Sequence, residues 1–267
     1  MKERTLKETV RIQGVGVHSG EVSTIYLHPE EEGGIRFIQE GTVIPAAIDS
    51  VGETDRGVVL SKEGRSIYTV EHLLAALFAC QIDHLLIQVE GVEVPALDGS
   101  AYPFITAMEK VGFKNLKKDK RKKHIKSSYL VEEKGCFAYL RPARELQIHY
   151  IISYDHPMLS YQEYRFNRGS DFNQEIARAR TYGFLSWKED LRSKGYALGS
   201  SMDNTLIYDE GGLVNEARFP DEAVRHKVLD LIGDLYLKRP FPIGSYLIFR
   251  GGHDLHFKLL KKIERSE

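Results

Sequence analysis

The sequence repeats one plan: in each half, a strand-rich stretch is followed by a helix that carries a histidine in its first turns. The first of these helices reads TVEHLLAAL and contains His72, and the second reads AVRHKVLDL and contains His226. The preceding stretches alternate polar and apolar residues, as in VSTIYLHP, or form short apolar runs, both of which are typical of strands. Strands followed by helices within each half predict two similar α+β domains and not one doubly wound sheet.

The sharpest change in composition lies between the two halves, in KNLKKDKRKKHIK at residues 114–126. Such a run favours a solvated linker, and attraction to an anionic surface, such as a membrane or a nucleotide, is the alternative. We therefore expect an N-terminal domain at 1–116, a basic linker at 117–126 and a C-terminal domain at 127–267. Within the C-terminal domain, strands are expected near 128–133, 136–140, 145–154 and 160–166, and helices at about 183–194, at about 221–237 and from about 255.

The composition is that of an ordinary globular protein, with 42% hydrophobic and 28% charged residues. The formal net charge of −1 argues against a protein that binds mainly to nucleic-acid phosphates. The only cysteines, Cys80 and Cys136, fit no paired ligand spacing, which argues against a disulfide framework or a cysteine zinc site. No apolar run is long enough to span a bilayer and the N-terminal segment has no apolar signal core, so we expect a cytoplasmic protein.

The segment AVRHKVLDLIGDL places His226, Asp230 and Asp234 on one side of a helix, because positions four apart differ by about 40° around the axis. The apolar residues of the segment lie on the opposite side, so the simplest interpretation is the wet face of an amphipathic helix. Wet faces usually mix charges, however, and two aspartates four residues apart repel each other unless a cation lies nearby. His226 and Asp230 could converge on one metal ion, and Asp234 could pair with a protonated histidine.

The helix after Thr69, which we expect to be its N-cap, begins with Glu71 and His72 and is otherwise apolar all round. An all-apolar helix is a buried helix. Glu71 could simply favour the helix N-terminus and His72 could be a satisfied core histidine. A buried carboxylate next to a buried histidine also suits a zinc hydrolase, in which His72 binds the ion and Glu71 takes a proton from water.

A third group follows a predicted strand, in the segment FRGGHDLH. His253 comes directly after Gly251 and Gly252, which allow the backbone to approach a substrate closely. The alternative is a tight turn with an incidental histidine. A carboxylate that keeps His253 protonated would make it a general acid, and Asp234 is the candidate for that role.

Taken together, these motifs resemble those of the UDP-3-O-acyl-N-acetylglucosamine deacetylases, zinc-dependent hydrolases of a linear amide that commit carbohydrate to lipid A synthesis in Gram-negative bacteria. The resemblance covers nearly the whole chain. The segments that carry it, in order, are GVGVHSG, TVEHLLAAL, VPALDGSAYPF, ARTYGFL, ALGSSMDNT, RFPDEAVRHKVLDLIGDLYL and GGHDL. It implies a two-domain α+β sandwich with the active site at the interface between the domains. It also implies that UDP-3-O-(3-hydroxyacyl)-N-acetylglucosamine is hydrolysed to acetate and the free amino sugar.

The resemblance also implies roles for individual residues. One catalytic zinc ion would be held by His72, His226 and Asp230. Glu71 would be the general base and His253 the general acid, with Asp234 orienting His253. Thr181 would stabilise the oxyanion. Substrate contacts would come from Lys227, His18, Tyr182, Tyr196 and Ser200, and an insert at about 183–209 would form the passage for the acyl chain.

Some positions depart from the family pattern. Ser200 replaces a glycine, Tyr182 a phenylalanine and His256 an asparagine, and Asp254 stands where a small residue is usual. Two alternatives fit the same motifs: hydrolysis of a different N-acyl sugar, and a non-catalytic relative that only binds the nucleotide sugar or zinc. Retention of both Glu71 and His253 argues against the second. We expect a monomer with a small-molecule substrate, no nucleic-acid partner and at most transient proximity to a membrane.

Overall fold

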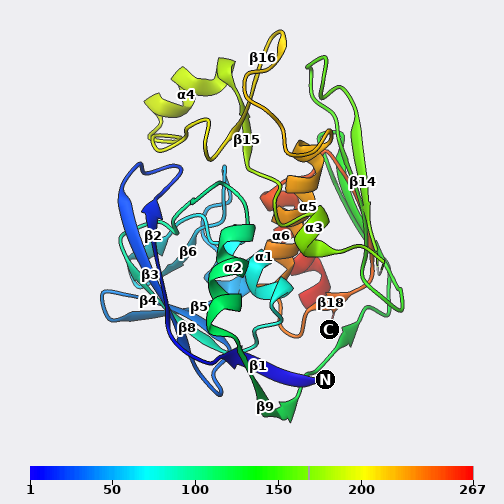
Figure 1. The fold of residues 1–267 in the computed structure, drawn as a ribbon. Coiled ribbons are helices and arrows are strands. Elements are labelled where there is room, and N and C mark those ends of the chain that lie inside the picture. Colours follow the sequence, from blue (N-terminus) through cyan, green and yellow to red (C-terminus); the bar gives the residue numbers. More distant parts are fainter. Residues whose placement is uncertain (168, 267) are drawn as a thin grey trace.

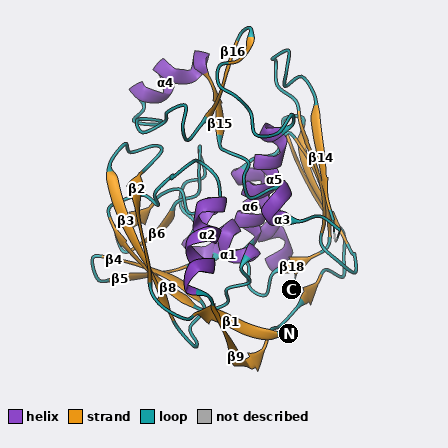
Figure 2. Cartoon of the chain, in the orientation of Figure 1, coloured by secondary structure: helices purple, strands orange, loops and turns teal. Residues whose placement is uncertain are grey.

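A computed structural model describes residues 1–167 and 169–266. Two five-stranded sheets form the outer layers, and the main helices lie between them (Figures 1 and 2). The arrangement confirms the predicted α+β sandwich. Within the described residues, no helix combines the length and the hydropathy that crossing a bilayer requires.

The two sheets share one topology. The first sheet has the order β2 (Val10–Val15), β3 (Val22–Pro29), β8 (Leu85–Glu90), β4 (Ile35–Gln39), β5 (Thr42–Pro45). The second has the order β11 (Tyr129–Glu133), β12 (Cys136–Arg141), β19 (Ser245–Phe249), β13 (Gln147–Ile152), β14 (Gln162–Phe166). In each sheet the strand that comes last in the sequence, β8 or β19, lies in the middle. It pairs in parallel with the strand that comes third in the sequence, β4 or β13, and all other pairs are antiparallel. The repeated plan of the sequence is therefore a repeated fold.

The helices are α1 (Glu71–Ala79), α2 (Tyr102–Val111), α3 (Phe172–Glu175), α4 (Lys188–Ser193), α5 (Glu222–Leu235) and α6 (His253–Glu264). The predicted cap of α1 is wrong: Val70 precedes the helix, and the Thr69 hydroxyl donates a hydrogen bond to Glu93 instead, at 2.7 Å. Helix α1 is buried along most of its length, as its composition predicts. It packs against α5 of the other half, which brings the two histidine-bearing helices into contact.

A glycine sets the spacing between α1 and α5. A Cβ atom on Gly233 would lie 2.2 Å from the carbonyl oxygen of Glu71, which is backbone and cannot swing away. Replacing Gly233 with alanine is expected to lower the free energy of unfolding by about 1–3 kcal/mol, because the helices must separate. Urea denaturation would measure the change. Gly183→Ala is the matched control: it adds the same methyl group in open space, and its effect should stay within about 0.5 kcal/mol.

The basic run between the halves is more structured than the solvated linker expected at 117–126. Its first part belongs to β9 (Phe113–Asp119), which pairs with β1 (Lys2–Leu6), and β10 (Lys123–His124) pairs in parallel with β18 (Pro242–Ile243). The crossing between the halves is thus tied to both of them.

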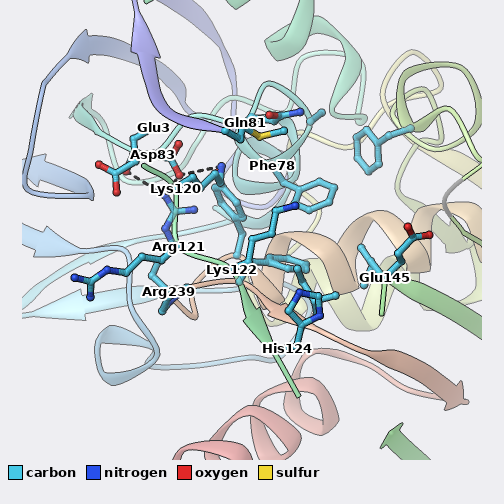
Figure 3. A pocket seen from close by; sticks show the side chains of 18 of the residues that line it. Glu3, Phe78, Gln81, Asp83, Lys120, Arg121, Lys122, His124, Glu145 and Arg239 are labelled. Atoms are coloured by element: carbon cyan, nitrogen blue, oxygen red, sulfur yellow. Dashed lines mark hydrogen bonds and ion pairs between the residues drawn. The ribbon is translucent and has the colours of Figure 1, made fainter. Parts of the chain in front are cut away.

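Beside this crossing lies a cavity with a volume of about 860 Å³ (Figure 3). It opens at the last turn of α1, where Phe78 lies between Glu3 and Asp83 on one side and Glu145 on the other. Asp83 is paired with Lys120 at 2.9 Å, and Glu3 with His84 at 2.8 Å. Neither of the two clusters of metal-ligand side chains among the described residues lies in this cavity.

The expected insert at about 183–209 is only partly helical. It contains β15 (Tyr182–Phe184), a 3₁₀ turn (Leu185–Trp187), α4 and β16 (Leu206–Asp209), and β17 (Gly212–Leu213) completes a small sheet with β15 and β16. The insert reaches over the first half (Figure 1). There the amides of Leu198 and Gly199 donate hydrogen bonds to the carbonyls of His18 and Val17. The remaining small elements are η1 (Ile48–Ser50) and the hairpin of β6 (Leu60–Lys62) and β7 (Arg65–Ile67).

Candidate metal centre and active site

Three side chains from the two central helices meet at one point. His72 comes from the first turn of α1, and His226 and Asp230 are one turn apart on α5. The Nε2 atoms of His72 and His226 lie 3.7 and 3.2 Å from Oδ1 of Asp230. All three side chains are buried, with at most 5% of each residue exposed. This face of the helix is therefore buried, which rules out the alternative of a solvated face.

The three side chains fit a metal ion. Oδ1 of Asp230 is buried and has no hydrogen-bond partner among the described residues, which is costly for a carboxylate oxygen unless a cation meets it. Ligands at about 2.0–2.2 Å around a tetrahedral zinc ion are roughly 3.3–3.6 Å apart, and the observed separations of 3.2 and 3.7 Å lie just on either side of this range. His226 directs Nε2 toward this point because its Nδ1 lies 3.0 Å from the carbonyl oxygen of Ala179. Burial and the neighbouring His226 lower the pKa of His72 to about 3, so its imidazole is neutral, as a metal ligand must be.

Glu71 lies beside this cluster and faces the first turn of α6. Its Oε2 accepts a hydrogen bond from the amide of Val58 at 3.0 Å, and Oε1 lies 4.0 Å from Nε2 of His253. Burial raises the pKa of Glu71 to about 7, although the nearby His253 works in the opposite direction. A carboxylate with a pKa near neutrality can both accept and release a proton under ordinary conditions.

His253 is the first residue of α6. It therefore lies in a helix and not in the tight turn that was the alternative. Its Nδ1 lies 2.8 Å from Oδ2 of Asp234, which is fully buried. Burial alone would lower the pKa of His253, but the Asp234 carboxylate raises it to about 9, so the imidazole is protonated at neutral pH. The neighbouring Asp254 is exposed and pairs with Lys258 at 2.7 Å.

Two further predicted residues lie at the same cluster. The ammonium of Lys227 donates a hydrogen bond to Oδ2 of Asp230 at 2.9 Å and lies 5.8 Å from the ring centre of Tyr182. Burial would lower the pKa of Lys227, but Asp230 raises it, so the side chain stays charged. Thr181 is held on both sides by the backbone, because its amide donates to Gly99 and its carbonyl accepts from Leu206, each at 2.8 Å.

These groups line a cavity of about 330 Å³ at the start of α1, built from both halves of the chain. The structure thus places His18, Thr181, Tyr182 and Lys227 around the same space as the predicted ligands, base and acid. Tyr196 and Ser200 are not among its lining residues. Tyr196 contacts the ring of His18 edge-on at 5.4 Å, and Ser200 donates a hydrogen bond to the hydroxyl of Thr205 at 2.9 Å.

Some residues of the site carry no signal in the sequence. Buried Glu93 accepts hydrogen bonds from the amides of His18 and Ser19 and from the hydroxyl of Thr69, so it fixes the GVGVHSG turn against the start of α1. Trp187 lines the cavity under the guanidinium of Arg56, at 4.8 Å. Such partners lie far apart in sequence, so only the folded chain identifies them.

Comparison with known proteins shows which family shares this pattern. The family model for UDP-3-O-acyl N-acetylglycosamine deacetylase matches residues 3–265. A protein of Nautilia profundicola named UDP-3-O-acyl-N-acetylglucosamine deacetylase is 40% identical over 100% of this chain and 93% of its own length. Proteins of the same name from Coxiella burnetii and Wolinella succinogenes are 39% and 37% identical, over 98% and 100% of this chain and 90% and 92% of their own lengths.

Proposed function

The chain belongs to the UDP-3-O-acyl N-acetylglycosamine deacetylase family, and on this premise we propose that it hydrolyses the N-acetyl group of UDP-3-O-(3-hydroxyacyl)-N-acetylglucosamine at a zinc site. The products are acetate and the free 2-amino sugar, the latter with its UDP and acyl groups intact. The observation that carries the metal part of the proposal is the orphaned Oδ1 of Asp230 beside two imidazole nitrogens. We infer that His72, His226 and Asp230 hold one ion.

A bound zinc ion would polarise the amide carbonyl and acidify water, since it withdraws electron density from any oxygen it meets. The residues around it complete the reaction. Glu71 accepts a proton from the attacking water, whose oxygen bonds to the carbonyl carbon. His253 gives its Nε2 proton to the amide nitrogen as the carbon–nitrogen bond breaks, because an amine anion cannot leave unaided. The positions of these two groups, 4.0 Å apart across the cavity, suit a shared substrate.

Two other side chains are assigned to the charge that develops on the substrate. The Thr181 hydroxyl would donate a hydrogen bond to the oxyanion, since its backbone is fixed on both sides and cannot drift. The Lys227 ammonium would bind an anionic or hydroxyl group of the nucleotide sugar. It is already charged and already directed into the cavity. The Tyr182 ring beside it would limit where the sugar can lie.

The test of this function is a comparison of substrates. Acetate release is measured with the zinc-loaded protein on UDP-3-O-(3-hydroxyacyl)-N-acetylglucosamine and on UDP-N-acetylglucosamine, which lacks the acyl chain. We expect the acylated substrate to be cleaved with the higher kcat/KM by a factor of at least about 100, because binding of the chain positions the amide. Cleavage of the unacylated sugar with equal efficiency would assign the chain to a different N-acyl sugar.

The rate is expected to follow a bell-shaped pH profile. Activity rises as Glu71 loses its proton, with a pKa of about 7, and falls as His253 loses its proton, with a pKa of about 9. A nearby divalent cation disfavours protonation, so the apparent pKa of each limb of the kcat/KM profile should lie at or below these values. The measurement is kcat/KM between pH 5 and 10. A profile that falls continuously with rising pH from 5 would contradict the assigned base.

The setting of the enzyme is also a proposal. We infer a monomer in the cytoplasm with at most transient contact with a membrane, because both halves of the site come from one chain and the substrate carries a water-soluble UDP group. Light scattering coupled to size-exclusion chromatography tests the oligomeric state.

A further inference from the structure

One carboxylate oxygen at the site serves two histidines. Oδ2 of Asp234 lies 2.8 Å from Nδ1 of His253 and 2.7 Å from Nδ1 of His256, while Oδ1 has no hydrogen-bond partner among the described residues. Asp234 and His256 are fully buried. Asp234 is therefore not only the partner of the proposed acid, since a second imidazole from the next turn of α6 holds the same oxygen.

The contacts are those of hydrogen bonds and not of a second metal site. Ligands of one zinc ion would be roughly 3.3 Å or more apart, whereas both N–O separations here are below 3 Å. Each of the two imidazoles therefore directs an Nδ1–H toward the same oxygen.

The far side of His256 is also fixed. Its Nε2 lies 3.0 Å from the hydroxyl of Tyr150, which is fully buried on β13. Burial raises the pKa of Tyr150 well above its ordinary value, so the hydroxyl keeps its proton and can donate a hydrogen bond to Nε2. Burial also lowers the pKa of His256, although Asp234 opposes this, and the ring is neutral. Because the ionised Asp234 carboxylate can only accept, the single proton of the neutral ring lies on Nδ1, which leaves Nε2 to accept from Tyr150.

The surroundings leave this chain little freedom. A Cβ on Gly251 would lie 2.9 Å from the Tyr150 hydroxyl and 2.4 Å from a side-chain carbon of Ile248, so the backbone before α6 closes directly over the tyrosine. The order Tyr150, His256, Asp234, His253 thus links a strand of the second sheet to the proposed acid through three hydrogen bonds.

We propose that His256 is a positioning residue of the deacetylase reaction: its Nδ1–H locks the Asp234 carboxylate in the rotamer that orients His253. The inference rests on the proposed function only for its effect on rate. Without the Nδ1–H donor of His256, Asp234 would keep only its hydrogen bond to His253. Its carboxylate group could then rotate and exchange the positions of Oδ1 and Oδ2. His253 would then lose its fixed direction toward the cavity.

The test compares two amide replacements. In His256→Asn the side-chain NH₂ falls near the position of Nδ1 and can still donate to Asp234, whereas in His256→Gln it falls near Nε2 and reaches only Tyr150. We expect His256→Gln to lower kcat about 10- to 100-fold with KM within about twofold and zinc content unchanged. His256→Asn should keep kcat within about threefold of the wild type.

A measurement independent of activity uses the ¹⁵N-histidine-labelled protein, with and without zinc. Imidazole N–H protons held by a buried carboxylate resonate far downfield, and we expect three such signals in the wild type, from His253, His256 and the His84 that pairs with Glu3. In His256→Gln the His256 signal should be lost and the other two should remain. Equal losses of kcat in the Asn and Gln variants, or unchanged kcat in His256→Gln, would overturn the proposal, as would a wild-type spectrum without the His256 signal. If the wild type releases no acetate, the proposed function fails, and the spectra alone decide the hydrogen bond.

Discussion

Replacing Glu71 with glutamine is expected to lower kcat by about 10²–10⁴-fold without loss of bound zinc. Glutamine has nearly the same shape, and its amide oxygen can still accept the hydrogen bond from Val58, but it cannot take a proton from water. The measurement is acetate release under substrate saturation, with zinc determined on the same samples. Activity within about tenfold of the wild type would show that another group is the base.

The Glu71 variant also offers a control for folding. In the folded, zinc-free protein the pKa of Glu71 is raised from 4.5 to about 7, so the folded state binds the proton more tightly than the unfolded state. This contribution to stability is present at low pH and is lost as the pH rises from about 4.5 through about 7. Glutamine does not ionise, so zinc-free Glu71→Gln should be at least as stable as the wild type at pH 8. A variant that is less active yet not less stable has lost chemistry and not structure.

Replacing His253 with asparagine is expected to lower kcat by a similar factor, about 10²–10⁴-fold. The asparagine NH₂ can still donate to Asp234, near the position of the imidazole Nδ1, but nothing replaces the Nε2 proton that the amide nitrogen needs. Zinc content should not change, because His253 is not one of the three ligands. Measured kcat within about tenfold of the wild type would remove His253 from the role of acid.

The double variant Glu71→Gln/His253→Asn sharpens both predictions. Base and acid serve one reaction sequence, so the combined loss in kcat should be smaller than the product of the two single losses. Multiplicative losses would indicate that the two residues act independently.

The periodicity of a single helix was sufficient to predict that His226, Asp230 and Asp234 share a face. It was not sufficient to predict whether that face is wet, because burial depends on what packs against it. The structure covers this face with α1, and the close approach depends on Gly233, whose role cannot be read from its own segment. The pairing of His72 with His226 came from the resemblance to a family, since helices from two halves of a chain can pack in many ways.

Local signals misled where a side chain had a distant partner. Thr69 is a good capping residue by type, but its hydroxyl is taken by Glu93, 24 positions away. His256 stood out in the sequence only as a departure from the family pattern, and its bonds to Asp234 and Tyr150 join residues 22 and 106 positions apart. The pairing of part of the basic run with β1 had no signal in the sequence, because charge alone does not reveal that β9 finds a partner strand. Buried polar contacts of this kind are decided by the whole fold.

The two aspartates of α5 have different proposed roles: Asp230 binds the metal and Asp234 orients His253. Replacing each in turn gives the most direct test of the proposed site. The measurement is bound zinc per chain together with kcat for Asp230→Ala and Asp234→Ala, both prepared in parallel with the wild type. Asp230→Ala should lose most of its zinc affinity and, with it, activity, because Oδ1 of Asp230 lies 3.7 and 3.2 Å from the Nε2 atoms of the two proposed imidazole ligands. Asp234→Ala should retain one zinc ion per chain and lose rate, because it removes the shared partner of His253 and His256 but none of the three proposed ligands. Full zinc affinity in both variants would contradict the assignment of the metal site.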